Sequence, residues 1–135
     1  MLHTTDDLRI AGLRPLIPPA ILMEELATTE AASITVSSAR EQICQALDGT
    51  DDRLVVIAGP CSIHDLEAAH EFADRLKKSA DQYADDLIVI MRIYFEKPRT
   101  TVGWKGLIND PHLDGSFAIN DGLRLARGLL LDLGN

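Results

Sequence analysis

The sequence has few aromatic residues, no excess of positive charge and no long apolar segment. Aromatic residues make up 4% of the 135 residues, so aliphatic side chains must form most of any core. The formal net charge of −8 argues against a nucleic-acid or anionic-membrane partner, because both favour a basic protein surface. No apolar run approaches the roughly 20 residues that span a bilayer, and residues 1–14 lack the apolar core of a signal peptide.

The sequence also lacks the short motifs of several enzyme classes. P-loop, GxGxxG, CxxC and HExxH patterns are absent, and no serine–histidine–aspartate set can be nominated. The two cysteines, Cys44 and Cys61, have no metal-type spacing, and nothing else indicates export. Free thiols in a reducing cytoplasm are therefore expected. With 46% hydrophobic and 25% charged residues, the composition is typical of one soluble globular domain.

Helix and strand patterns alternate along the chain behind an N-terminal arm. Residues 1–28 mix charged residues with prolines that interrupt regular structure, although Pro19 can open a short helix through Leu26. Thr29 is a candidate N-cap for the next helix, and Gly49 is a candidate stop. After the arm, helices are predicted at residues 29–49, 65–80 and 119–133. Strands are predicted at residues 54–58 and 87–94, and a long loop at residues 97–118.

Strands that alternate with helices predict βαβ units and a parallel sheet. The continuous apolar run at 54–58 is typical of a strand buried on both faces. Two parallel strands, however, leave both sheet edges open, and a complete (β/α)₈ barrel needs roughly 250 residues. We therefore expect an incomplete α/β fold that stops where a third strand should begin.

The first motif whose side chains could take part in catalysis or metal binding is Gly59-Pro60-Cys61-Ser62-Ile63-His64-Asp65, between the first strand and the following helix. Active sites of parallel α/β folds lie at this end of the strands, where Cys61 could be a metal ligand or a nucleophile. A small, buried, inert cysteine is about equally compatible with the pattern. His64 could share a metal with Cys61, but a helix-start residue facing solvent or a polar neighbour is favoured. Ser62 and Asp65 fit a helix-capping pattern.

The second motif gathers positive charge at the end of the second strand. Arg92, Lys97, Arg99 and Lys105 fall close together in an otherwise acidic protein, with Glu96 as the only acid among them. Such a cluster favours an anion site, because arginine binds phosphate or carboxylate in a bidentate way and lysine acts as a point charge. Arg92 and Lys97 differ in parity, so they cannot share a face of one straight strand, and we expect the strand to end near residue 95. A solvated basic loop is the alternative.

The third motif is a long loop that contains the only tryptophan. Trp104 lies between Gly103 and Gly106. Long loops that hold an anchor residue are often functional, but a hydrophobic plug that ties the loop down fits equally well. The final helix carries a predicted apolar face made of Ile119, Leu123, Ala126, Leu130 and Leu133.

These motifs resemble the class I 3-deoxy-D-arabino-heptulosonate 7-phosphate (DAHP) synthases of the feedback-regulated type found in enteric bacteria. The matching segments are GPCSIHD at 59–65, MRIYFEKPRTTVGWKGLINDP at 91–111 and INDGLRLAR at 119–127. The resemblance implies an α/β fold, the N-terminal portion of a (β/α)₈ TIM barrel preceded by a regulatory extension. Residues 1–50 would form the arm and a helix, and residues 51–135 the first two β/α units.

The resemblance also implies an activity, the condensation of phosphoenolpyruvate with erythrose 4-phosphate in the shikimate pathway of aromatic amino-acid biosynthesis. Cys61 would be one ligand of a divalent metal of the Mn, Fe, Co or Zn class. Arg92 and Lys97 would bind phosphoenolpyruvate, with Lys97 as the candidate catalytic residue. Arg99 and Thr100 would hold the sugar phosphate.

On the arm, Asp7 would belong to a feedback site for an aromatic amino acid, and a full-length form would be a homo-oligomer. The other metal ligands of the family lie in later strands, so the 135-residue chain alone is expected to be inactive. A truncated, non-catalytic remnant or a subunit-binding module is the alternative function.

Overall fold

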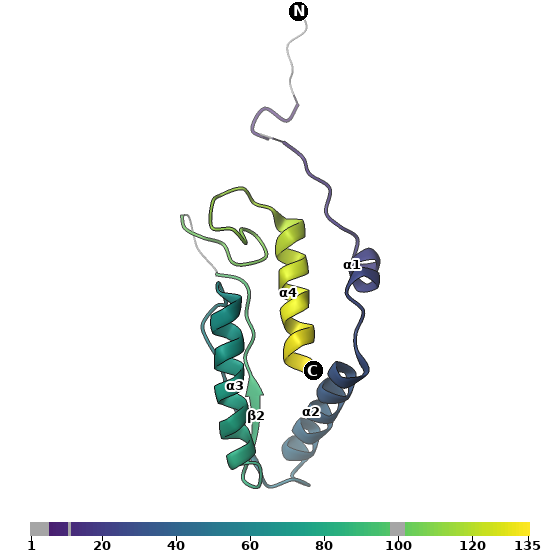
Figure 1. The fold of residues 1–135 in the computed structure, drawn as a ribbon, viewed down its shortest axis with the longest axis vertical. Helices are drawn as coiled ribbons and strands as arrows, with labels where there is room; N and C mark the ends of the chain where they lie inside the picture. Colours follow the sequence, from purple (N-terminus) through teal and green to yellow (C-terminus); the bar gives the residue numbers. More distant parts are fainter. Residues whose placement is uncertain (1–5, 11, 98–101) are drawn as a thin grey trace, which may run out of the picture.

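The computed structural model describes residues 6–10, 12–97 and 102–135. In chain order the elements are α1 (Pro19–Glu25), α2 (Glu30–Asp48), β1 (Leu54–Ala58), α3 (Leu66–Gln82), β2 (Leu87–Met91) and α4 (Ile119–Gly134). Each predicted helix and strand is therefore present. Figure 1 shows α3 and α4 on either side of β2, with α2 at the opposite end from the long loop that precedes α4. Among the described helices, none combines the length and apolarity that a membrane crossing requires.

The helix ends follow local chemistry. Thr29 Oγ1 accepts a hydrogen bond from the Ala32 amide at 3.1 Å, and Gly49 ends α2 in the left-handed region with φ 82°, as predicted. The capping prediction for Ser62 is wrong. Because α3 begins at Leu66, Asp65 is itself the N-cap and accepts from the Ala68 amide at 3.0 Å, while the buried Ser62 Oγ has no partner among the described residues.

The two strands pair in parallel, as the alternating pattern predicts. The register runs from Leu54 opposite Leu87 to Ala58 opposite Met91. Burial of β1 on both faces is not observed, because Leu54 and Ile57 are 69% and 68% exposed. The described residues form only a two-stranded sheet, so they leave part of the apolar surface of β1 open.

The core lies between α3, α4 and the chain that follows β2. Its buried residues are Ile63, Ala69, Leu107 and Leu129, and Leu66, Ile93, Phe95, Trp104 and Leu133 pack against them. Leu66 and Ala69 lie in the first turns of α3, whereas Ile63 and Leu107 belong to the segments after β1 and β2. The core therefore fixes the loops at the carboxyl ends of the strands.

The N-terminal arm runs beside α4 and is attached to it by polar contacts (Figure 1). Asn120 accepts from the Ile17 amide at 2.9 Å, and Arg124 forms an ion pair with Glu25 at 2.7 Å. Arg127 Nε donates to the Leu26 carbonyl at 2.7 Å. Hydrogen bonding to Arg124 lowers the pKa of Glu25, so the pair persists over a wider acidic range than an isolated glutamate would allow.

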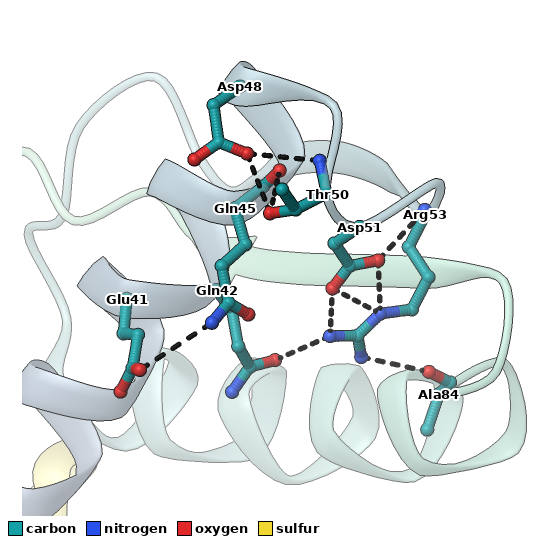
Figure 2. A network of polar contacts seen from close by, with 8 residues as sticks. All are labelled: Glu41, Gln42, Gln45, Asp48, Thr50, Asp51, Arg53 and Ala84. Carbon is teal, nitrogen blue, oxygen red and sulfur yellow. Dashed lines mark hydrogen bonds and ion pairs between the residues drawn. The ribbon is translucent and has the colours of Figure 1, made fainter.

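Arg53 joins three elements at the amino ends of the strands (Figure 2). Its Nη2 lies 2.6 Å from Asp51 Oδ2 and also donates to Gln42 Oε1 of α2 at 3.2 Å. Its Nη1 donates to the Ala84 carbonyl, between α3 and β2, at 3.1 Å. Hydrogen bonding to Arg53 lowers the pKa of Asp51. One side chain thus connects α2, the start of β1 and the turn before β2.

Arg53→Ala is expected to lower the melting temperature by roughly 4 °C, because several hydrogen bonds are lost together. The matched control is Arg75→Ala, which removes an exposed ion pair with Glu71 within α3 and should have little effect. The pKa of Asp51 is lowered in the folded protein. The stability that the Arg53–Asp51 ion pair contributes is therefore fully present above the ordinary aspartate pKa, and it is lost as the pH falls through the lowered pKa. Thermal unfolding of both variants across this pH range is the measurement, and equal effects of the two substitutions would contradict the role of Arg53.

Candidate active site

The candidate site lies where both strands end. Cys61 follows β1 and Arg92 follows β2, and carboxyl ends of paired parallel strands meet at the same edge. Gly59 permits this approach: a Cβ atom at that position would lie 2.3 Å from the Arg92 carbonyl oxygen and 2.8 Å from Arg92 Cβ. The Arg92 amide donates to the Ala58 carbonyl at 2.7 Å. The glycine therefore lets the two motif-bearing segments lie directly against each other.

Arg92 holds the backbone of the cysteine loop. Its Nη1 donates to the carbonyl of Pro60 at 2.5 Å and to that of Cys61 at 2.9 Å. The guanidinium carbon lies 4.8 Å from the centre of the Tyr94 ring, a distance at which a cation is attracted to the ring face. Both hydrogen bonds use the same guanidinium nitrogen, and the planar fork of arginine offers further donors for an anion.

Lys97 lies against the thiol of the same loop. Its Nζ is 3.2 Å from Cys61 Sγ; Cys61 is exposed and Lys97 is half-buried. Arg92 and Lys97 differ in parity along the chain, yet both contact Cys61, Arg92 at its carbonyl oxygen and Lys97 at its sulfur. The reason is that β2 ends at Met91, earlier than predicted, so the intervening residues do not continue a straight strand.

A short antiparallel contact positions Lys97. Its amide donates to the Lys105 carbonyl at 3.0 Å, the Leu107 amide donates to the Phe95 carbonyl at 2.8 Å, and Glu96 pairs with Gly106. Gly106 has φ 123°, and a Cβ there would lie 2.2 Å from the Phe95 carbonyl oxygen. The sequence pattern did not predict this pairing, although Gly106 was a signal for it.

His64 and Cys61 do not form a metal site with other side chains that the structure describes. His64 is exposed and its ring meets that of Trp104 edge to face, with centroids 6.3 Å apart. Within residues 6–10, 12–97 and 102–135, no group of three His, Cys, Asp or Glu side chains could hold a metal ion. Cys61 offers one sulfur donor, which suits a single ligand position of a thiophilic divalent metal.

Trp104 ties the long loop to the core, as the plug interpretation proposed. It packs against the cluster that contains Ile63 and Leu107, and its Nε1 donates to the Asp110 carbonyl at 2.8 Å. Asp110 is buried, and its carboxylate oxygens accept from the Gly115 amide at 3.2 and 3.3 Å. The described part of the loop, from Val102 onward, thus packs on the core and supports Lys97 through Lys105.

Three further residues were predicted for functional sites. Arg99 and Thr100 lie outside the described residues. Asp7 is exposed on the arm, where its carbonyl accepts from the Ile10 amide at 3.0 Å and its φ is 56°. A cavity of about 730 Å³ is lined by residues of the arm and of the start of α4; its lining includes Arg14, Phe117 and Asn120 but not Asp7.

Comparison with known proteins matches residues 27–132 to the DAHP synthetase I family. The chain is 58% identical over 133 residues to the Phe-sensitive phospho-2-dehydro-3-deoxyheptonate aldolase of Escherichia coli K12, covering 98% of this chain and 38% of that protein. It is 56% identical over 128 residues to the tyrosine-inhibited aldolase of Candida albicans, covering 95% of this chain and 35% of the relative.

A solved structure of the Francisella tularensis aldolase superposes with a TM-score of 0.88 at 50% identity, covering 93% of this chain and 37% of that one. The chain therefore spans well under half the length of these three relatives. The family match extends over most of the sequence and includes both motifs that meet at Cys61. On this evidence the chain belongs to the DAHP synthetase I family.

Proposed function

We propose that this chain supplies part of the active site of a DAHP synthase, which condenses phosphoenolpyruvate with erythrose 4-phosphate and releases phosphate. The observation that carries the proposal is the meeting of Cys61, Lys97 and Arg92 at the carboxyl ends of two parallel strands, in a chain of this family. In this view residues 51–135 are the first two β/α units of a (β/α)₈ barrel, and residues 1–50 are an extension before it.

The cations fit the charge of the proposed substrates. Phosphoenolpyruvate carries a carboxylate and a phosphate, and erythrose 4-phosphate carries a second phosphate. Arg92 and Lys97 are placed by backbone contacts at the strand ends, so they can bind the anionic groups of phosphoenolpyruvate with little reorganisation. Arg99 and Thr100, outside the described residues, are proposed for the sugar phosphate.

The chemistry requires two substrates to be held against each other. C3 of phosphoenolpyruvate attacks the aldehyde carbon of the sugar, water adds at C2, and the bond from C2 to the phosphate oxygen breaks. Fixed cations can orient the first substrate for this attack, and orientation of two reactants supplies much of an enzyme's acceleration. We assign Lys97 the catalytic position because it lies beside both the proposed metal ligand and the anion site.

Cys61 is the one proposed metal ligand within the described chain. A bound divalent metal of the Mn, Fe, Co or Zn class would supply Lewis-acid polarisation of the aldehyde. The exposed Sγ suits one ligand position, and the described residues provide no group of three donors. We infer that the remaining ligands come from a longer protein.

We also propose how the full-length protein is regulated and assembled. The E. coli relative is Phe-sensitive and the C. albicans relative is tyrosine-inhibited, so we assign Asp7 to a feedback site for an aromatic amino acid. We propose a cytoplasmic homo-oligomer for the full-length form.

The test is synthase activity of two proteins. One is the 135-residue chain; the other, here called the extended protein, continues residues 1–135 with the remainder of the E. coli relative. We expect turnover of both substrates with Mn²⁺ only in the extended protein, and we expect a chelator to abolish it and added Mn²⁺ to restore it. An inactive but folded extended protein would refute the proposed function, and turnover by the 135-residue chain would refute the shared metal site.

A further inference from the structure

We infer that Trp104 is a positioning residue that holds the Cys61 loop and the Lys97 segment in contact. The inference rests on the proposed function for its catalytic meaning, but the contact itself is a property of this chain. Trp104 touches neither the sulfur nor the ammonium group in any contact given by the structure. Trp104 acts instead through neighbouring residues of the Cys61 loop and of the Lys97 segment.

On the cysteine side, Trp104 contacts His64 through its ring and packs on the buried cluster that contains Ile63. Ile63, two residues after Cys61, is 2% exposed and lies in the cluster against which Trp104 packs. His64 follows and meets the Trp104 ring edge to face, an arrangement that aromatic pairs favour. Because Ile63 and His64 are fixed in this way, the loop that carries Cys61 has little freedom to move away from β2.

On the lysine side, Trp104 precedes the residue that pairs with Lys97. The Lys105 carbonyl accepts the Lys97 amide at 3.0 Å. The indole also closes its own loop, since Nε1 donates to the Asp110 carbonyl at 2.8 Å. Trp104 is therefore anchored at its polar edge, in ring contact with His64 of the cysteine loop, and joined by one peptide bond to the partner of Lys97.

This arrangement gives the tryptophan a role that core packing alone does not require. Leu129, on α4, belongs to the same buried cluster but lies on neither loop. Loss of either side chain should weaken the core. Only loss of Trp104 should change the distance between Cys61 Sγ and Lys97 Nζ, which is 3.2 Å in this structure.

A ratio of alkylation rates reports this distance without reference to enzyme activity. In a Cys44→Ser background, Cys61 is the only thiol, and it can react with anionic iodoacetate or neutral iodoacetamide. A nearby ammonium group attracts the anionic reagent, so the ratio of the two rates reports the position of Lys97, while the fraction of thiolate cancels. We expect the ratio in the folded 135-residue chain to exceed that of the urea-unfolded chain by about fivefold, and Lys97→Gln to remove the excess.

Trp104→Ala should lower this ratio to near the unfolded value, whereas Leu129→Ala should lower the melting temperature but keep the ratio. Trp104→Phe keeps an aromatic ring beside His64 and should retain most of the excess. Measurements are made below the melting temperature of each variant. Equal loss in Trp104→Ala and Leu129→Ala, or no excess in the parent, would overturn the inference. Neither result bears on synthase activity, so failure here is distinct from failure of the proposed function.

Discussion

Replacement of Cys61 by alanine in the extended protein is expected to abolish metal-dependent turnover. The thiol is the one proposed metal ligand among the described residues, and it lies 3.2 Å from the Lys97 ammonium group. Changes behind a metal ligand already cost about 10–100-fold, so loss of the ligand itself should lower activity by more than about 100-fold. The measurements are turnover with saturating Mn²⁺ and the amount of metal bound per subunit.

Cys44→Ala is the matched control for this experiment. Cys44 is also a free, exposed cysteine, but it lies within α2, away from the strand ends. Its replacement should leave turnover and bound metal nearly unchanged, because exposed positions without polar partners tolerate such changes. If the two variants lost activity or metal to the same extent, the assignment of Cys61 would be wrong.

Local sequence patterns were sufficient to predict the elements of the fold. The Thr29 cap and the Gly49 stop act within one helix, so they can be identified without knowledge of the tertiary structure. Parallel pairing of β1 and β2 also followed from the intervening helix. These features depend on residues close together in the chain.

The features of the fold that the sequence did not predict depend on contacts between segments that are distant in the chain. On α4, Leu130 was predicted to face the core but is 47% exposed, and the buried positions are Gly122, Ala126 and Leu129. Gly122 explains the difference, because a Cβ there would lie 2.2 Å from the Ile108 carbonyl oxygen. Because Gly122 has no side chain, the loop packs directly on its side of α4, and this contact sets the orientation of the helix.

The candidate site shows the same limit. Residue types identified Arg92, Lys97 and Cys61 as candidates, and the alternation rule indicated only that the strand ends before Lys97. Their meeting at Cys61 depends on the end of β2 and on the pairing of Lys97 with Lys105. Similarly, the polar residues Asn120 and Arg124 of α4 bind the arm, a contact that the apolar pattern of the helix could not reveal.

The arm carries the second large expected effect, the relief of feedback inhibition by Asp7→Asn in the extended protein. A carboxylate is a natural partner for the ammonium group of an amino acid, and Asp7 is exposed while its arm is held along α4. Asparagine removes the charge but tolerates the left-handed backbone that Asp7 adopts, with φ 56°. Turnover without effector should therefore be retained.

Inhibition curves with phenylalanine and with tyrosine, for the parent and for Asp7→Asn, measure this effect. Loss of a charge-assisted hydrogen bond to the effector should raise the inhibition constant by about tenfold or more, and Asp7→Ala should do the same. Asp52→Ala is the control, since Asp52 is an exposed aspartate just before β1 and should leave inhibition unchanged. We expect phenylalanine to be the stronger inhibitor. An unchanged inhibition constant in both Asp7 variants would remove Asp7 from the effector site and leave the arm with its structural role along α4.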